Sequence, residues 1–245
     1  MKIVQRRRES LYVWRHVHLN LSRAIIFVLL FVFAIALFIQ GEYLTSSVGL
    51  VLIPIAYALG LLSLQKKSIW QTGSMGEEDV LSHLEKLDDN YNVINGLVVP
   101  PNRGDTDHII LGPNGIFVIE TKNYAGVIHC DGDDWTREKI GRGGTPYPLE
   151  IGSPSNQVKR NAKVLKDFVL EHQSEIFKER EAPHLWVNSI VVFTRKDVIL
   201  DLKNSTVSIV EVEDLADYIE SQESEYELSK EEVKRMGYTI LKHSS

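Results

Sequence analysis

The hydrophobic pattern of the chain begins with two long apolar runs, at 24–39 and 48–64. Neither run contains Asp, Glu, Lys or Arg, and each lies near the lower limit of roughly 17 to 25 residues that a helix needs to cross a bilayer. Apolar residues on their flanks extend both runs. The pattern therefore predicts two membrane-spanning helices within residues 24–64.

This prediction has two alternatives. A buried helical hairpin of a soluble domain would produce the same apolar runs, and the pattern alone leaves this alternative open. A cleaved signal peptide fits the first run poorly, because no small-residue cleavage site follows Ile39 and a second apolar run comes after a short linker. A two-helix membrane hairpin is the leading interpretation.

Shorter periodic segments follow a polar connector at 68–75. Val80, Leu81 and Leu84 fall on one stripe at the helical period of 3.6 residues, which predicts a helix over 76–87. Two runs of β-branched and aromatic residues flank a Gly-Pro-Asn-Gly turn, which predicts a β-hairpin. In all, strands are expected at 91–99, 106–111, 116–122, 127–129, 185–194 and 206–212, and further helices at 157–173, 213–220 and 229–241.

The order of these elements sets the expected fold class. Strands are grouped, with helices before and after them, which favours a mixed sheet flanked by helices over a strictly alternating parallel sheet. The glycine- and proline-rich stretch between 129 and 157 is expected to be irregular, with Ser155 or Asn156 capping the next helix. We therefore expect an α/β domain over 68–245, preceded by the transmembrane hairpin and a basic segment at 1–23.

Charge divides the chain at Lys67. Residues 1–67 contain 8 basic and 2 acidic residues, a formal charge of +6, whereas residues 68–245 contain 19 and 31, a charge of −12. Basic residues precede the first apolar run and follow the second, and the loop between the runs has none. The positive-inside rule therefore predicts that both termini and the folded domain are cytoplasmic.

The net charge of the folded domain and the cysteine content limit the functions that the chain can have. An acidic domain argues against a protein that coats nucleic acid through bulk charge, so any attraction to a polyanion must be local or carried by a metal ion. Cys130 is the one cysteine of the chain. It cannot form an intrachain disulfide, and in a reducing compartment we expect a buried or inert thiol.

Three charged residues lie at the ends of the predicted hairpin strands, away from the turn: Asp107, Glu120 and Lys122. A two-residue turn at 113–114 sets Asp107 opposite Glu120, whereas a bulge at Gly115 would make the pair diagonal. Two close carboxylates repel each other unless a cation lies between them, and Mg²⁺ or Mn²⁺ is the natural cation for such ligands. Asp107 and Glu120 are therefore candidate metal ligands, and Lys122 can steady an attacking hydroxide or a charged phosphorane.

Two polar residues on the predicted helices join this group. Glu77 lies within the apolar stripe of its helix, where a carboxylate is costly to bury without a partner, although acids are also common at helix N-termini. Gln157 shares the apolar side of its own helix. On the opposite side Lys159, Lys163 and Lys166 form a stripe that we expect to be solvated.

Taken together, the segments resemble the nuclease-related domain family, NERD. GEEDVLSHLEKL, YNVINGLVVP, DTDHIILGPNGIFVIETKNYAG, Trp135, SPSNQ and IVVFT occur in the expected order over roughly 73–195. The resemblance implies a restriction-endonuclease-like fold that is distantly related to the PD-(D/E)xK nucleases. It implies five site residues, namely Asp107 and Glu120 as metal ligands, Lys122 as the catalytic lysine, and Glu77 and Gln157 from the helices.

Two functions follow as hypotheses. The first is a membrane-anchored nuclease, dependent on Mg²⁺ or Mn²⁺, that hydrolyses DNA phosphodiester bonds at the inner face of the membrane. The second is a non-catalytic nucleic-acid-binding or sensing module that keeps the same fold, which the charge of −12 favours. Asp105 replaces Asp107 as a ligand if the strand register differs.

Overall fold

The computed structural model describes the backbone of residues 2–5, 11–39, 43–102, 104–141 and 143–244. The chain divides into two compact units. We call the first the sheet unit, which comprises Met1–Arg7 and Gly76–Ser245. The second, the hairpin unit, comprises Arg8–Met75.

The hairpin unit is built from two helices, α1 (Leu11–Ile39) and the first part of α2 (Tyr43–Leu84). Within them Val17–Ile39 and Ser47–Lys66 are long and apolar enough to cross a membrane, with mean hydropathies of 2.7 and 2.1. Only 11% and 17% of their apolar windows are buried in the structure. Burial within the described part of the chain therefore does not account for their apolar composition.

Small residues let the two helices approach closely. A Cβ atom on Gly49 would lie 2.6 Å from the carbonyl oxygen of Ala34, and Ala34 is fully buried. Contacts of this kind are common where helices associate in lipid, because close backbone approach increases van der Waals packing.

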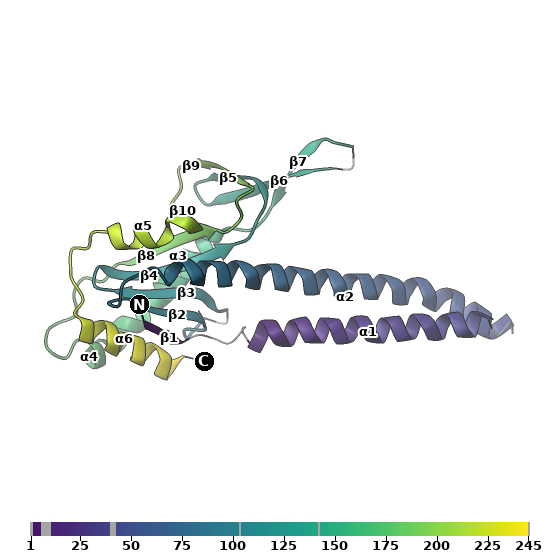
Figure 1. Cartoon of the computed structure of the whole chain (residues 1–245), viewed down its shortest axis with the longest axis horizontal. Helices are drawn as coiled ribbons and strands as arrows, with labels where there is room; N and C mark the ends of the chain where they lie inside the picture. The colour runs from purple at the N-terminus through teal and green to yellow at the C-terminus, as the bar shows by residue number, and fades with distance from the viewer. Residues whose placement is uncertain (1, 6–10, 40–42, 103, 142, 245) are drawn as a thin grey trace. The chain divides into compact units, whose positions relative to one another are not determined.

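The sheet unit contains a six-stranded mixed sheet with the strand order β1-β2-β3-β4-β8-β10 (Figure 1). β3 is antiparallel to both β2 and β4, whereas β1–β2, β4–β8 and β8–β10 are parallel pairs. The strands are β1 (Lys2–Gln5), β2 (Asn92–Leu97), β3 (Thr106–Gly112), β4 (Gly115–Lys122), β8 (Val187–Phe193) and β10 (Ser208–Glu211).

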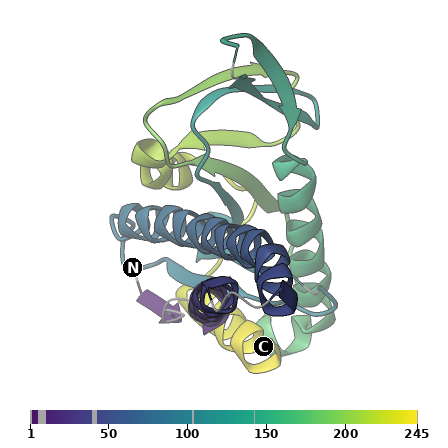
Figure 2. The same cartoon turned by 90° about the vertical axis from the view of Figure 1, so that its right-hand side faces the viewer.

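Helices cover both faces of this sheet (Figure 2). Ile109 packs in one core with Leu165 of α3, and its neighbour Ile110 packs in a second core with Leu84 of α2. Successive residues of a strand point to opposite faces, so the predicted mixed sheet flanked by helices is confirmed. The helices that follow α2 are α3 (Pro154–Glu171), α4 (Gln173–Ile176), the 3₁₀ turn η1 (Val212–Asp214), α5 (Leu215–Ser221) and α6 (Lys230–His243).

A second, four-stranded sheet has the order β7-β6-β5-β9 (Figure 1). The expectation of an irregular stretch after residue 129 was wrong. Gly132, with φ of +62°, makes the turn from β5 to β6, and buried Trp135 stacks on Phe193 at 6.0 Å to attach the new sheet to the first. The strands are β5 (Gly126–Asp131), β6 (Asp134–Ile140), β7 (Pro146–Glu150) and β9 (Val198–Lys203).

Two local predictions also need correction. Residues 68–75 form part of α2, although their polar composition had indicated a connector. The N-cap of α3 is Ser153, whose side chain accepts a hydrogen bond from the backbone N–H of Asn156, and Pro154 begins the helix. Proline is favoured at this position because its missing N–H would have no helical partner there.

Candidate functional site

The predicted acidic pair lies at the end of the β3–β4 hairpin that is farther from its turn. The two strands pair without a bulge, and His108 faces Ile119. Continuing this register by one residue places Asp107 opposite Glu120. Strand alternation turns both side chains toward the sheet face of Ile109, which is the face that α3 covers. The predicted hairpin is therefore confirmed, and of the two registers that its turn allowed it has the one without a bulge.

The neighbouring strand holds the Asp107 carboxylate. Its Oδ2 accepts a hydrogen bond of 2.7 Å from the backbone N–H of Thr121. Burial raises the pKa of Asp107 well above its ordinary value, and the negative charge of Glu120 raises it further. The Thr121 hydrogen bond and the Lys122 charge oppose this shift. An ionised Asp107 is thus costly here unless another cation lies close to it.

Glu120 is almost fully buried, with 2% of its surface exposed. Its Oε1 accepts a hydrogen bond of 2.5 Å from Lys122 Nζ, whereas its Oε2 has no hydrogen-bond partner among the described residues. Burial raises the pKa of Glu120, Lys122 opposes the shift, and the charges of Asp105 and Glu77 add to it. Buried polar atoms normally have a partner, so this orphaned carboxylate oxygen indicates a place for a ligand.

Lys122 connects the acidic pair to α3. Besides Glu120, its Nζ donates to Oε1 of Gln157 at 3.4 Å. Burial by itself would lower the pKa of Lys122, but the charge and hydrogen bond of Glu120, together with the charge of Asp107, outweigh it and raise the pKa. Lys122 is therefore a positively charged ammonium at neutral pH, and it cannot act as a general base in this state.

The two helices that flank the sheet bring the remaining predicted residues close. Gly76 lets α2 approach the ends of β4 and β8, because a Cβ atom there would lie 3.1 Å from Cβ of Asn123 and 3.2 Å from Oγ1 of Thr194. The next residue, Glu77, is half-buried, and its charge raises the pKa of Glu120. All five predicted residues thus belong to one electrostatic group, with Gln157 attached through its contact with Lys122.

Asp105 adds its charge to this group from a position before β3. It is exposed and precedes β3, and its charge raises the pKa values of both Asp107 and Glu120. The observed register, continued by one residue, sets Asp107 and not Asp105 opposite Glu120. Asp105 therefore contributes to the negative potential of the site without occupying the paired strand position.

Two polar pairs near the site were not predicted. Asn102 Nδ2 donates to Asn161 Oδ1 at 2.9 Å and so ties the segment before β3 to α3. On the other face of the sheet, Nδ1 of buried His108 lies 2.8 Å from Oδ1 of buried Asn95. Burial lowers the pKa of His108 to about 3, so its ring is neutral. The sequence feature that could have predicted the His108–Asn95 pair is the presence of a histidine and an asparagine inside otherwise apolar strands.

The residues at the acidic site fit a hard divalent cation. The two acids lie one residue beyond the last strand pair, His108 and Ile119, and one of them has a buried oxygen without a protein partner among the described residues. Carboxylate oxygens are the ligands that Mg²⁺ and Mn²⁺ prefer. The positive charge of such an ion would offset the burial and the neighbouring negative charges that raise the pKa values of Asp107 and Glu120.

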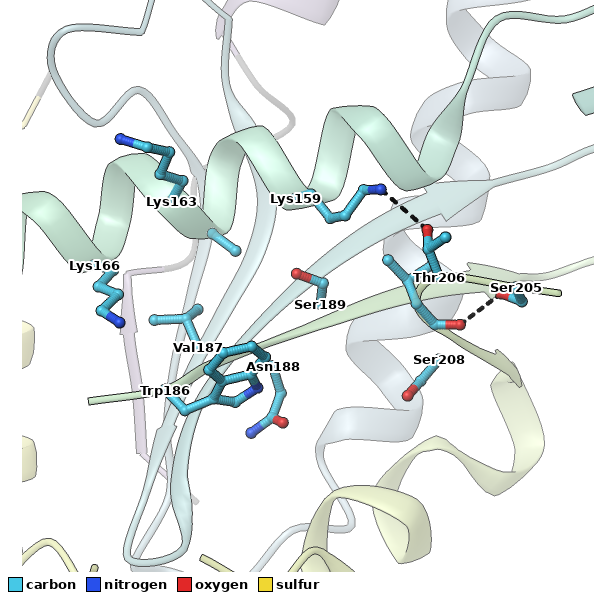
Figure 3. A pocket seen from close by; sticks show the side chains of 12 residues that line it. Lys159, Lys163, Lys166, Trp186, Val187, Asn188, Ser189, Ser205, Thr206 and Ser208 are labelled. Atoms are coloured by element: carbon cyan, nitrogen blue, oxygen red, sulfur yellow. Dashed lines mark hydrogen bonds between the residues drawn. The ribbon is translucent and has the colours of Figure 1, made fainter. Parts of the chain in front are cut away.

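A groove of about 600 Å³ lies between α3 and the strands β8 and β10 (Figure 3). Lys159, Lys163 and Lys166 line one side, so the predicted lysine stripe borders a concave surface. Trp186, with 64% of its surface exposed, lies on the other side. Lys159 is already engaged, because its Nζ lies 2.7 Å from Asp133. We call this feature the lysine groove.

Comparison with known proteins identifies the family. The profile of the nuclease-related domain, NERD, matches residues 72–194, which is half of the chain. The chain belongs to the NERD family. It is also 31% identical over 199 residues to an uncharacterized protein of Bacillus anthracis, an alignment that covers 78% of this chain and 86% of that protein. Comparison with solved structures found no significant match.

The NERD match includes every residue of the acidic site. Glu77 and Gln157 lie inside its bounds together with the β3–β4 hairpin. Family membership therefore supports a nuclease-like fold for this segment, and the hydrogen bonds described above place a charged, partly desolvated cluster within it.

Proposed function

We propose that this NERD protein is a membrane-anchored, divalent-metal-dependent nuclease that hydrolyses phosphodiester bonds of DNA. One observation carries the proposal: buried Glu120 has one oxygen bound to Lys122 and a second oxygen without a protein partner among the described residues. Asp107 and Glu120 lie one residue beyond the last strand pair, His108 and Ile119, and the charge of Glu120 raises the pKa of Asp107. An acid pair beside a fixed ammonium suits the binding and cleavage of a phosphodiester.

Each residue has a distinct role in this proposal. Asp107 and Glu120 would hold Mg²⁺ or Mn²⁺, which when bound supplies Lewis-acid activation of water and phosphate. Lys122, held between Glu120 and Gln157, provides a fixed positive charge for the negative charge that develops on the phosphoryl oxygens. Because its two acceptors already position the ammonium, little reorganisation is needed during the reaction.

The proposal is tested by cleavage of labelled DNA with the full-length chain in detergent, with Mg²⁺, with Mn²⁺ and with a chelator. Glu120→Gln keeps the size of the side chain and removes its charge, and it should lower the cleavage rate at least about 100-fold. Asp217→Asn, which changes an exposed acid on α5, is the matched control and should retain the wild-type rate. Absence of cleavage by the wild type with any metal and with DNA or RNA would count against a nuclease.

The membrane anchor is part of the same proposal. α1 and α2 contain segments apolar enough to cross a bilayer. β1 precedes α1 in the chain, yet it pairs with β2, which follows α2. A chain that leaves one sheet and returns to it crosses the membrane an even number of times, and the basic flanks of the two segments favour the cytoplasmic side for that sheet.

A second candidate function is nucleic-acid binding without cleavage, and the lysine groove favours it. Lysines can contact phosphates, and exposed Trp186 offers a face on which a base can stack. Binding of a labelled single strand by the full-length chain, measured by fluorescence anisotropy, should then weaken steeply with salt. Lys166→Ala and Trp186→Ala should reduce affinity, whereas Lys139→Ala, which changes an exposed lysine on β6, should not. Binding of this kind with no turnover identifies a binding module.

A further inference from the structure

A second group of metal-binding side chains lies where α3, α4 and α6 meet. His172 follows the last residue of α3, Glu175 belongs to α4, and His243 is the last residue of α6. One potential ligand atom from each residue lies within 4.8 Å of the other two. We propose that His172, Glu175 and His243 form a binding site for a transition-metal ion, with Zn²⁺ as the expected occupant.

The His172 ring is oriented for metal binding. Its Nδ1 lies 3.0 Å from the backbone carbonyl oxygen of Phe168. A carbonyl oxygen only accepts hydrogen bonds, so Nδ1 carries a proton, and in the neutral ring Nε2 then has the lone pair that can bind a metal ion. The ring also stacks on Phe168 with 4.3 Å between centroids. A histidine ligand usually donates its other ring N–H to a carbonyl or carboxylate in this way, which fixes both the tautomer and the ring.

The two carboxylate oxygens of Glu175 contact different residues. Its Oε1 lies 3.9 Å from Nε2 of His243, and its Oε2 lies 3.4 Å from Nζ of Lys242. An ion could therefore bind Oε1 while Lys242 keeps its contact with Oε2. The lysine would then hold the carboxylate in the orientation that the ion requires.

The distances are close to those of a closed site. Zn²⁺ bonds of about 2.0 to 2.1 Å at tetrahedral angles separate two ligand atoms by about 3.4 Å. The three ligand atoms lie within 4.8 Å of one another, so closure needs side-chain movements of about 1 Å. Glu175 and His243 are exposed and can make these movements, whereas half-buried His172 is anchored on Phe168. With three protein ligands, the fourth position is left to water.

The ligand types separate this site from the acidic site. Imidazole nitrogens suit Zn²⁺ and its neighbours, whereas Mg²⁺ prefers oxygen ligands. The proposal therefore does not rest on the proposed nuclease function. Because the ligands come from α3–α4 and from α6, a bound ion would cross-link the C-terminal helix to the rest of the sheet unit and stabilise the folded state.

The test measures metal binding by the full-length chain, without a polyhistidine tag, in detergent. Zn²⁺ affinity and stoichiometry are measured by calorimetry, and Co²⁺ is used as a coloured substitute. The wild type should bind an ion at this site. His172→Ala and His243→Ala should each lower the affinity for that ion at least about tenfold. His184→Ala, which removes an exposed histidine elsewhere, is the matched control and should bind as the wild type does.

Two further variants make the result interpretable. His243→Cys retains a ligand for Zn²⁺ and should keep binding, with a sulfur-to-Co²⁺ absorption band that the wild type lacks. Glu120→Gln separates the two sites, because it removes charge from the acidic site only. Equal affinity and stoichiometry in the wild type and both alanine variants would overturn the proposal. Loss of all Zn²⁺ binding in Glu120→Gln would overturn it as well.

Discussion

Lys122 bears on both the stability and the chemistry of the acidic site, because it satisfies one oxygen of the buried Glu120 carboxylate. A buried charge that loses its partner keeps its full desolvation cost. Gln157 is an uncharged amide and does not replace an ammonium. The contribution of Lys122 can therefore be measured as folding energy, independently of any cleavage assay.

We expect Lys122→Met to lower the free energy of unfolding by about 1 to 3 kcal/mol, because Glu120 is left buried and unpaired. The double variant Glu120→Gln with Lys122→Met should recover part of this loss, since an uncharged amide costs less to bury. Urea denaturation with a chelator present, followed by tryptophan fluorescence, measures the free energy of unfolding of the single and the double variant. Lys163→Met changes an exposed lysine of α3 and should cost less than about 1 kcal/mol. A Lys122→Met variant as stable as the wild type would contradict this account.

Asp133 provides a prediction about pH. Hydrogen bonds from Lys159, Thr206 and Ser155 lower its pKa from 3.8 to about 2. Because the folded-state pKa is the lower one, Asp133 stabilises the protein above about pH 4, and this stabilisation disappears as pH falls from about 4 toward about 2. Asp133→Asn should therefore melt at a lower temperature than the wild type at pH 7, with a difference that narrows near pH 3.

Thermal denaturation at several pH values checks this expectation. Asp134→Asn changes the adjacent exposed acid and is the matched control, so its difference from the wild type should stay small at every pH. A difference for Asp133→Asn that remained constant down to pH 2.5 would show that its hydrogen bonds do not depend on ionisation.

At the scale of elements, the contact of α2 with the ends of β4 and β8 positions Glu77. Gly76 faces Cβ of Asn123 and Oγ1 of Thr194, and a Cβ atom there would lie close enough that these neighbours must shift by a few tenths of an ångström. The same helix offers a comparison three residues earlier, because among the described residues no atom outside the local helix lies within 4 Å of the position where a Cβ of Gly73 would be.

We expect Gly76→Val to lower the free energy of unfolding by about 1 to 3 kcal/mol through overpacking, and to reduce cleavage by moving Glu77. Gly73→Ala should be neutral or slightly stabilising, because alanine has the higher helix propensity. Urea denaturation and the cleavage assay on both variants test the prediction. If Gly73→Ala lowered stability or cleavage more than Gly76→Val, the close approach at Gly76 would not explain the effect of substitution in this helix.

At the scale of the whole molecule, the sheet unit is built from two segments of the chain. One precedes the hairpin unit in the sequence and the other follows it. Met1–Arg7 and Gly76–Ser245 form the sheet unit, although the two candidate membrane segments lie between them in the chain. This arrangement makes the topology testable with single cysteines, since the native Cys130 is buried. Burial also raises the pKa of its thiol, which lowers its reactivity.

In a Cys130→Ser background, Ser46→Cys places a thiol near the start of α2, between the two apolar segments in the chain, and Ser224→Cys places one on an exposed loop of the sheet unit. With a cytoplasmic sheet unit, an impermeant maleimide should label the first variant in intact cells and the second only after lysis. Labelling is measured by mass shift. The reverse pattern would invert the orientation, and equal labelling only after lysis would argue against a membrane hairpin.

The sequence alone determined the features that depend on residues close together in the chain. Two continuous apolar runs were enough to predict segments able to cross a membrane. The Gly-Pro-Asn-Gly turn was enough to predict the hairpin and to limit its register to two possibilities, because turn residues and strand alternation act over a few residues. The structure has the register without a bulge. That register was sufficient to set Asp107 opposite Glu120. Cleavage and metal binding at this pair stay predictions.

Tertiary structure decided what depends on packing between distant segments. β7 is exposed throughout, and Trp135 is the one buried residue of β6, so the apolar alternation that would reveal these strands is weak. The contact of Lys122 with Gln157 exists only because α3 packs across β4 and β8. His172 and His243 meet for the same reason, since α4 packs on α6. Periodicity assigns a residue to a face, but only the packing of helices on the sheet determines which faces meet.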